Sequence, residues 1–355
     1  MNEGGAGFGV AERPMPVRRL LGMIGKACIN LVALAAASTV IPAPSLARGS
    51  DSQPVSVFHS SLSVTFPEGV TREMLGKRTL ETIALQVMLD RSRHSPGVID
   101  GYMGSNTRRA IRYYRQANGL PEGDGVDEEL ISSLAKTYGG PTFTTHKISE
   151  EDASSQFPEN PDDFAEMAKD DRLNYESASE MFSERFHMDQ GFLEALNPNA
   201  NFSQAGTTLV IVSHGDEKLA AGIAKIEVRK DDNTVAALDK DGKVIASYPA
   251  TIGSDDFPSP NGEMKVKAIA TEPKYYFDPE DQKWGPGKRL TIAAGPNNPI
   301  GGTWIDLGKE GYGIHGSPDP QMVGKRTSHG CVRLTNWDAE ELARAVTTGV
   351  PVIFL

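Results

Sequence analysis

Three side chains near the C-terminus of this sequence could carry covalent chemistry. His315 is followed by Gly316, and a loop later the chain reads His329-Gly330-Cys331. Side chains alternate between two faces of an extended chain, so His329 and Cys331 project to the same side. Two imidazoles near one thiol can create a thiolate, which is the nucleophilic form of cysteine. The pattern predicts acyl transfer through Cys331.

Two other interpretations of these residues stay open. His315, His329 and Cys331 are also the side chains of a three-ligand catalytic zinc site, although no nearby carboxylate or second cysteine supports it. The third interpretation is an inert cysteine beside core histidines. Two glycines and the charged Arg333 are unusual neighbours in a sealed core. The chain has two cysteines, Cys28 and Cys331, which allow one disulfide at most.

The elements that must position this site are mainly strands. Alternating apolar residues predict strands near residues 224–228, 234–238, 244–248, 264–268 and 350–355. Asp241-Gly242 between two of them is typical of a hairpin turn. Thr335-Asn336-Trp337-Asp338 is a capping-box pattern and predicts one helix that runs to about Val346. The C-terminal part is therefore predicted to be mostly antiparallel β structure with one helix.

The segment from His315 to Arg333 resembles the signature of L,D-transpeptidase catalytic domains. The likeness covers residues 221–355 and includes Ser328-His329-Gly330-Cys331-Val332-Arg333 and, upstream, Gly295-Pro296-Asn297-Asn298-Pro299-Ile300-Gly301. The resemblance implies a β-sandwich with the cysteine in a cleft under a mobile loop. It also implies an acyltransferase that cross-links peptidoglycan through a cysteine thioester.

The resemblance also implies roles for single residues. Cys331 would be the nucleophile, and His315 the general base and acid, with its imidazole oriented by the carbonyl of Gly316. His329 and the backbone N–H groups of Gly330 and Cys331 would bind the oxyanion. Residues expected to contact the substrate are Arg333, Ser328, Tyr275, Tyr276 and Trp284. Arg333 would pair with a substrate carboxylate, or else would hold the loop by hydrogen bonds to carbonyls.

The N-terminus predicts export. Arg18 and Arg19 precede an apolar run at residues 29–41, and Ser45 and Ala47 fit the small-x-small pattern of a signal-peptidase site. Residues 1–47 are therefore predicted to be a cleaved signal peptide, with an uncleaved anchor as the alternative and Met15 as an alternative start. Residues 48–71 are predicted to be a linker. The expected location is the periplasm of a Gram-negative envelope.

Residues 72–139 predict a three-helix domain. Helices are expected from Thr79, from Ser105 or Asn106 to Asn118-Gly119, and from Asp127 to Gly139. The run at residues 100–110 and Asn118-Gly119-Leu120-Pro121 resemble the small peptidoglycan-binding domain of many cell-wall enzymes. Its second helix carries four arginines that could touch wall carboxylates or simply form a solvated face: Arg108, Arg109, Arg112 and Arg115.

A second polar stretch, residues 140–162, is predicted to be a linker. Residues 163–215 predict two short helices, Ala178 to Phe186 and Asp189 to Leu196, followed by a strand from Thr208 to Val212. This run resembles a LysM carbohydrate-binding module, but the first strand of that family is not evident before Glu176. It could bind glycan or only separate the other two domains.

The fold class expected is a multidomain chain that is mainly β, with a helical peptidoglycan-binding domain and a small α+β LysM-like module. The net charge of −11 argues against nucleic-acid binding, which needs clustered cations. The expected partners are peptidoglycan stem peptides and glycan, with the membrane met only through the signal segment. The resemblance implies no metal and no organic cofactor.

The expected reaction joins third-position diaminopimelate residues of two stems. Alternatives that keep the thioester are hydrolysis, as an L,D-carboxypeptidase or endopeptidase, and transfer to a D-amino acid or an outer-membrane protein. A sortase-like enzyme also uses His, Cys and Arg, but its His lies farther before the Cys. A papain-like peptidase is disfavoured because its Cys precedes its His. A non-catalytic wall-binding scaffold is the alternative of another class.

Overall fold

The computed structural model describes residues 67–215, 219, 222–253, 261–280, 287–309, 311–325 and 331–355. The predicted signal peptide at 1–47 and most of the predicted linker at 48–71 lie outside these residues. All described residues belong to one compact unit, Pro54–Leu355. Within the described ranges, no helix is both long and apolar enough to cross a membrane.

The first helices follow their predicted caps closely. A 3₁₀ turn, η1 (Glu73–Leu75), precedes α2 (Leu80–Arg91), α3 (Ser105–Asn118) and α4 (Glu128–Tyr138). Thr79 and Asp127 cap α2 and α4, because their side chains accept hydrogen bonds from backbone amides of the first turn. The cap of α3 is Gly104 and not Ser105 or Asn106. Gly119 ends α3 in the left-handed conformation, with φ 65°.

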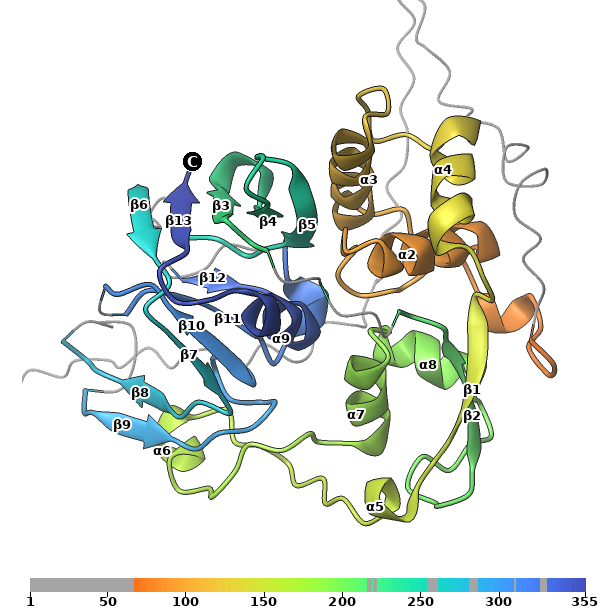
Figure 1. The fold of residues 1–355 in the computed structure, drawn as a ribbon. Coiled ribbons are helices and arrows are strands. Elements are labelled where there is room, and N and C mark those ends of the chain that lie inside the picture. Colours follow the sequence, from red (N-terminus) through yellow and green to blue (C-terminus); the bar gives the residue numbers. More distant parts are fainter. Residues whose placement is uncertain are drawn as a thin grey trace, which may run out of the picture. The chain divides into compact units, whose positions relative to one another are not determined.

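The arginines of α3 are engaged inside the protein. Arg112 pairs with Asp232, and Arg115 is 3% exposed and pairs with Asp127 at 2.6 Å. Arg109 donates a hydrogen bond of 3.0 Å to the backbone carbonyl of residue 324. The helix lies beside β5 (Val244–Pro249) of the C-terminal sheet (Figure 1). Arg109 and Arg112 therefore bond the C-terminal part of the chain, and Arg115 bonds the start of α4.

The stretch predicted to be the second linker contains regular structure. It holds β1 (Phe143–Lys147) and α5 (Glu150–Ala153), and β1 pairs antiparallel with β2 (Thr208–Val212). The sequence gives little signal for β1, because its side chains are half-buried or exposed and hydrophobic residues do not alternate clearly along it. Between the strands lie α6 (Phe164–Met167), α7 (Ala178–Arg185) and α8 (Gln190–Leu196). The LysM-like assignment and the domain boundaries stay predictions.

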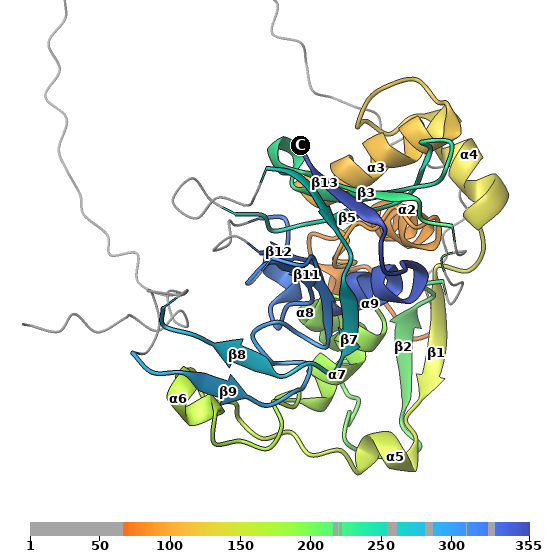
Figure 2. The same ribbon diagram turned by 60° about the vertical axis from the view of Figure 1, so that its left-hand side comes forward.

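The C-terminal part contains two main sheets (Figures 1 and 2). The five-stranded sheet has the order β5-β4-β3-β13-β6, with β3 (Lys225–Arg229), β4 (Thr234–Leu238), β13 (Pro351–Phe354) and β6 (Gly262–Lys265). The four-stranded sheet has the order β12-β11-β10-β7, with β12 (Val332–Arg333), β11 (Gly313–His315), β10 (Thr303–Asp306) and β7 (Ala268–Thr271). The pairs β3–β13 and β11–β12 are parallel, and the other pairs in these sheets are antiparallel.

One hydrophobic core joins both sheets to α9 (Asn336–Ala345), as expected for a β-sandwich. It includes Ile226, Val235 and Val352 from the first sheet, Ile305, Ile314 and Val332 from the second, and Leu342 from the helix. The single strand predicted at residues 264–268 is in fact two. The chain leaves the first sheet after β6, buries Val266, and enters the second sheet as β7.

The remaining elements are short. The hairpin of β8 (Tyr275–Phe277) and β9 (Leu290–Ile292) forms a sheet of its own. The 3₁₀ turns η2 (Lys230–Asp232) and η3 (Pro320–Met322) complete the described elements.

Candidate functional site

Adjacent parallel strands position His315 and Cys331. Ile314 pairs with Val332 and His315 with Arg333, while Cys331 comes directly before β12. Ile314 and Val332 are buried in the core between the sheets. Since side chains alternate along a strand, His315, Cys331 and Arg333 project from the opposite face. The structure thus brings these three predicted residues together.

The His315 imidazole is fixed in one tautomer. Its side chain is buried, and Nδ1 lies 2.7 Å from the carbonyl oxygen of Gly316. A carbonyl only accepts hydrogen bonds, so Nδ1 carries the proton and Nε2 is the nitrogen that can accept one. The ring also stacks on Trp304, with centroids 5.5 Å apart and planes 24° apart. The family resemblance implied this role for the Gly316 carbonyl, whereas Trp304, on the neighbouring strand, has no local signal in the sequence.

His315 and Cys331 are both neutral at rest. Burial, helped by the charge of Arg333, lowers the pKa of His315 to about 3. Burial raises the pKa of the Cys331 thiol, although Arg333 and a backbone hydrogen bond with Gly313 oppose this. Cys331 Sγ donates a hydrogen bond of 3.2 Å to the carbonyl oxygen of Gly311. These shifts leave a thiol at Cys331 and a neutral imidazole at His315, whereas His329, the second imidazole of the sequence argument, lies outside the described residues.

The upstream Gly-Pro-Asn segment, residues 295–301, packs against Gly316, the residue that follows His315. Asn298 is fully buried, accepts a hydrogen bond of 2.9 Å from Ile300 N through its side chain, and accepts one of 2.7 Å from Gly301 N through its carbonyl. Gly301 has φ +62°, and a Cβ there would lie 2.7 Å from the carbonyl carbon of Gly316 and would overlap Asn336 Oδ1. Only glycine fits this close approach.

Asn336 joins this loop to α7 in the preceding segment. Its Oδ1 accepts a hydrogen bond of 3.2 Å from Gly302 N, and its Nδ2 donates bonds of 2.8 Å to Glu184 Oε2 and 3.2 Å to Pro296 O. Burial raises the pKa of Glu184 to about 8. In the sequence, Asn336 is recognisable only as part of a helix cap, and nothing points to Glu184.

Arg333 has one donor without a partner. Its backbone exchanges two hydrogen bonds of 2.9 Å with Thr251. Its Nε is buried and has no hydrogen-bond partner among the residues that the structure describes. The side chain as a whole is half-buried. A buried donor without a hydrogen bond is costly.

The predicted lid residues are only partly described. Tyr275 is half-buried in β8 with its ring edge-on to Phe164, at 5.8 Å and 80°, while Tyr276 is 70% exposed. Figure 2 shows their hairpin below the four-stranded sheet. Trp284, Ser328, His329 and Gly330 lie outside the described residues. Their roles stay predictions.

Comparisons with known proteins identify the family of this chain. A family model described as "L,D-transpeptidase catalytic domain" matches residues 224–354, and one described as "Putative peptidoglycan binding domain" matches residues 78–129. The "Putative L,D-transpeptidase YkuD" of Bacillus licheniformis is 28% identical over 46% of this chain and 84% of its own length. The "Putative L,D-transpeptidase YqjB" of Bacillus subtilis is 32% identical over 36% of this chain and 68% of its own. The chain belongs to the L,D-transpeptidase family. Among solved structures, an L,D-transpeptidase from Mycobacterium smegmatis matches 43% of this chain and 74% of its own, at 18% identity and a TM-score of 0.32.

Membership of this family indicates the class of reaction and the polymer. This L,D-transpeptidase is an acyltransferase with a β-rich catalytic domain and an N-terminal peptidoglycan-binding domain. Both domains imply peptidoglycan as the polymer and the cell envelope as the location.

Proposed function

We propose that this enzyme forms cross-links between third-position diaminopimelate residues through an acyl-thioester on Cys331. The observation that carries the proposal is the pairing of β11 and β12, because it sets His315 and Cys331 on one face within the matched family domain. The donor is a tetrapeptide stem. The enzyme acts in the periplasm after export.

Each step follows from the groups at the site. The Cys331 sulfur attacks the carbonyl carbon of the third residue, its proton passes to His315 Nε2, and the imidazolium returns a proton to the departing D-alanine amine. The side-chain amine of a second stem then attacks the thioester and forms the new amide bond. The thiolate leaves and regains the proton lost by that amine.

The neutral resting pair shapes this mechanism. Proton transfer from a thiol of raised pKa to an imidazole of lowered pKa is uphill, so it must be coupled to attack on the bound carbonyl. His329 and the N–H groups of Gly330 and Cys331 would supply the oxyanion contacts. Ser328, Arg333, Tyr275, Tyr276 and Trp284 are the proposed substrate-binding residues.

Incubation of the full-length enzyme with purified muropeptides, read by mass spectrometry, tests the proposal. The expected product is a dimer joined between two third-position residues, with one D-alanine released. Trimmed tripeptides alone would identify a carboxypeptidase, and a shifted mass with added D-amino acid would identify exchange. Cys331→Ala must abolish every product, since a folded variant that still turns over would remove Cys331 from the mechanism.

A further inference from the structure

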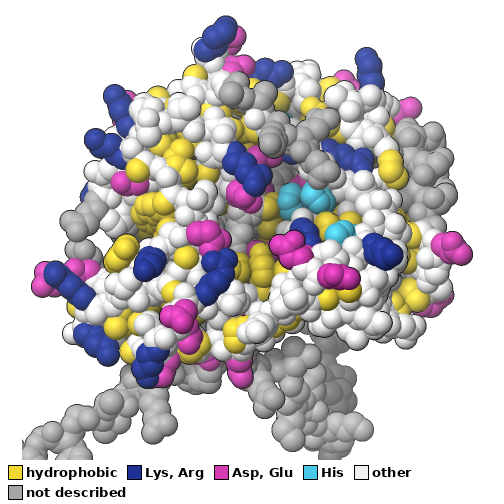
Figure 3. Space-filling view, turned by 60° about the horizontal axis from the view of Figure 1, so that its bottom comes forward, with side chains coloured by type: hydrophobic (Ala, Val, Ile, Leu, Met, Phe, Trp, Pro, Cys, Tyr) yellow, Lys and Arg dark blue, Asp and Glu magenta, His cyan; other side chains and the backbone are white. Residues whose placement is uncertain are grey.

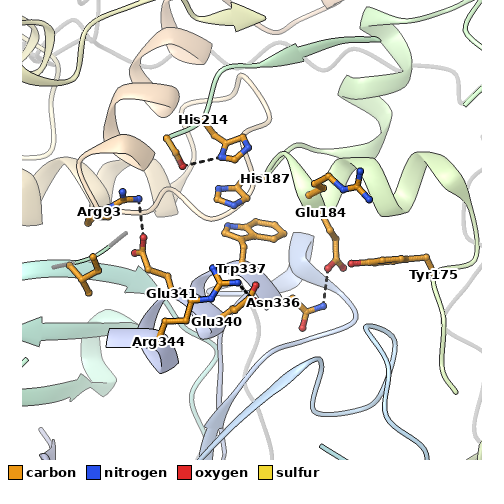
Figure 4. A pocket seen from close by; sticks show the side chains of 13 residues that line it. Arg93, Tyr175, Glu184, His187, His214, Asn336, Trp337, Glu340, Glu341 and Arg344 are labelled. Carbon is orange, nitrogen blue, oxygen red and sulfur yellow. Dashed lines mark hydrogen bonds and ion pairs between the residues drawn. The ribbon is translucent and has the colours of Figure 1, made fainter. Parts of the chain in front are cut away.

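A polar pocket lies on α9, among segments that are distant in sequence. It has a volume of about 420 Å³, and its walls include Arg93 after α2, His187 after α7, His214 after β2 and Trp337 of α9. His187 lies between the other two rings (Figure 4): its centroid is 5.1 Å from that of Trp337 and 4.5 Å from that of His214. Histidine side chains also reach the molecular surface among charged groups (Figure 3).

Asp90 completes a compact group with these two histidines. One ligand atom from each of Asp90, His187 and His214 lies within 4.8 Å of the other two. His187 Nδ1 is 3.1 Å from Asp90 Oδ1 and 3.3 Å from Oδ2. The Asp90 side chain is only 5% exposed and that of His187 is 19% exposed.

The orientation of His214 suits a metal ligand. Its Nδ1 lies 3.2 Å from the carbonyl oxygen of Gly215, so this nitrogen carries the proton. Nε2 is then the nitrogen with the lone pair. Histidines that bind metals usually donate their second N–H to a carbonyl or carboxylate in this way, which fixes the tautomer.

We propose that Asp90, His187 and His214 bind a divalent transition-metal ion, with Zn²⁺ as the expected occupant. Two imidazoles and one carboxylate suit zinc, whereas Mg²⁺ and Ca²⁺ prefer oxygen ligands throughout. The pocket beside both histidines leaves room for a water ligand in the fourth position. This site is separate from the Cys331 thiol and does not depend on the proposed reaction.

The ion would act as a clamp between parts of the fold. Asp90 belongs to α2 of the peptidoglycan-binding region, whereas His187 lies between α7 and α8 and His214 follows β2. Trp337, stacked on His187, belongs to the helix that follows the Cys331 strand. A metal that binds the folded state stabilises it by an amount that grows with the logarithm of the metal concentration over Kd, so Zn²⁺ should raise the melting temperature.

The test uses the full chain, purified without a histidine tag and carrying Cys331→Ser so that the thiol cannot bind zinc. Titration calorimetry with ZnCl₂ alone should show one ion per chain, and Zn²⁺, but not Mg²⁺, should raise the melting temperature. Adding His187→Gln, His214→Gln or Asp90→Asn should weaken Zn²⁺ binding at least tenfold. Adding His146→Gln is the matched control, because His146 lies on β1 beside Asp152 and outside the group.

The outcomes separate a metal site from an ordinary ion pair. Circular dichroism without metal shows whether each variant is folded. Visible absorption of Co²⁺ bound to the parent protein reports nitrogen and oxygen ligation even where a variant fails. Absence of Zn²⁺ binding in the parent would overturn the proposal. So would equal affinity in the His187→Gln, His214→Gln and His146→Gln proteins.

Discussion

The side-chain amide of Asn336 donates a hydrogen bond of 2.8 Å to the carboxyl group of Glu184. Asn336 also packs close to Gly316, where an added Cβ would overlap its Oδ1, and the Gly316 carbonyl orients His315. A helix outside the matched catalytic domain thus reaches the support of the proposed catalytic imidazole. Tyr175 points toward the same carboxyl group (Figure 4). The segment before the catalytic domain is therefore part of the foundation of the site and not only a spacer.

Glu184→Gln should make the protein less sensitive to alkaline pH. The folded state holds the pKa of Glu184 at about 8, above the ordinary value of about 4.3, so the native state keeps a proton that the unfolded chain has lost. The free energy of unfolding must then fall as pH rises between these values. Gln keeps the acceptor for Asn336 without the charge, so the variant should be about 1–3 kcal/mol more stable than the parent at pH 9.

Urea unfolding at pH 6 and pH 9 measures this difference. Asp338, with a pKa raised by burial to about 7, contributes a decline of the same sign in both proteins, so the variant flattens the curve only in part. Glu166→Gln is the matched control, because Glu166 is exposed and pairs with Lys169. An identical pH dependence in all three proteins would show that Glu184 is ionised in the native state.

Gly301→Ala should damage both stability and activity. Gly301 has a positive φ, and an added methyl group would overlap Asn336 and crowd Gly316. Gly349→Ala is the control, since Gly349 also has a positive φ, of 91°, but nothing lies within 4 Å of its Cβ position. The control isolates the backbone strain of about 1–2 kcal/mol. The melting temperature of Gly301→Ala should fall clearly more than that of Gly349→Ala, and its kcat should fall because His315 is displaced.

Periodicity and caps predicted most of the fold because those signals are local. The first residues of α2, α4 and α9 follow from the N-capping residues Thr79, Asp127 and Thr335. β1 was missed because its register is set by pairing with β2, some sixty residues later, and not by its own hydrophobicity. The break between β6 and β7 was missed for a related reason. Val266 continues the alternation while the chain changes sheets.

The candidate site likewise contains residues that local sequence signals predict and residues that they do not. His315, Gly316 and Cys331 follow from short-range spacing and from the family resemblance. Trp304 and Glu184 could not be found, since one comes from an adjacent strand and the other from another region of the chain. The state of the thiol was also beyond the sequence, because burial decides it and burial is a property of the whole fold.

The rate of Cys331 alkylation by iodoacetamide should rise with pH, with a midpoint above the ordinary thiol pKa of about 8.5. Only the thiolate reacts, and burial raises the pKa of this thiol. Arg333→Gln should slow alkylation at pH 8 further, because the charge that favours the thiolate is gone, whereas Arg333→Lys should change it little. His315 should add no inflection near pH 6.5, since its pKa is lowered to about 3. A midpoint below pH 8 would contradict the neutral resting state.

Arg333→Lys should separate the charge of Arg333 from its shape. Arg333 shares the face of Cys331, and its buried Nε lacks a partner among the described residues. A guanidinium offers a planar fork that matches a carboxylate, and an ammonium does not. If the donor stem presents a carboxylate to this fork, Arg333→Lys should lower kcat/KM although the Cys331 alkylation curve is kept. Arg333→Ala should lower it further, by about 1.5–3 kcal/mol per lost charge-assisted bond, or roughly ten- to a hundredfold.

Paired donors decide between recognition and packing at Arg333. With a stem whose carboxylates are free, both variants should lose activity, and with the amidated stem the loss should shrink, because the parent enzyme also lacks the ion pair there. A purely structural role gives a different pattern. Loss would then be equal on both donors and would accompany a lower melting temperature. Since the backbone of Arg333 already bonds Thr251 in every variant, thermal melts report only the side chain. Unchanged melts together with donor-dependent kinetics would assign Arg333 to the substrate.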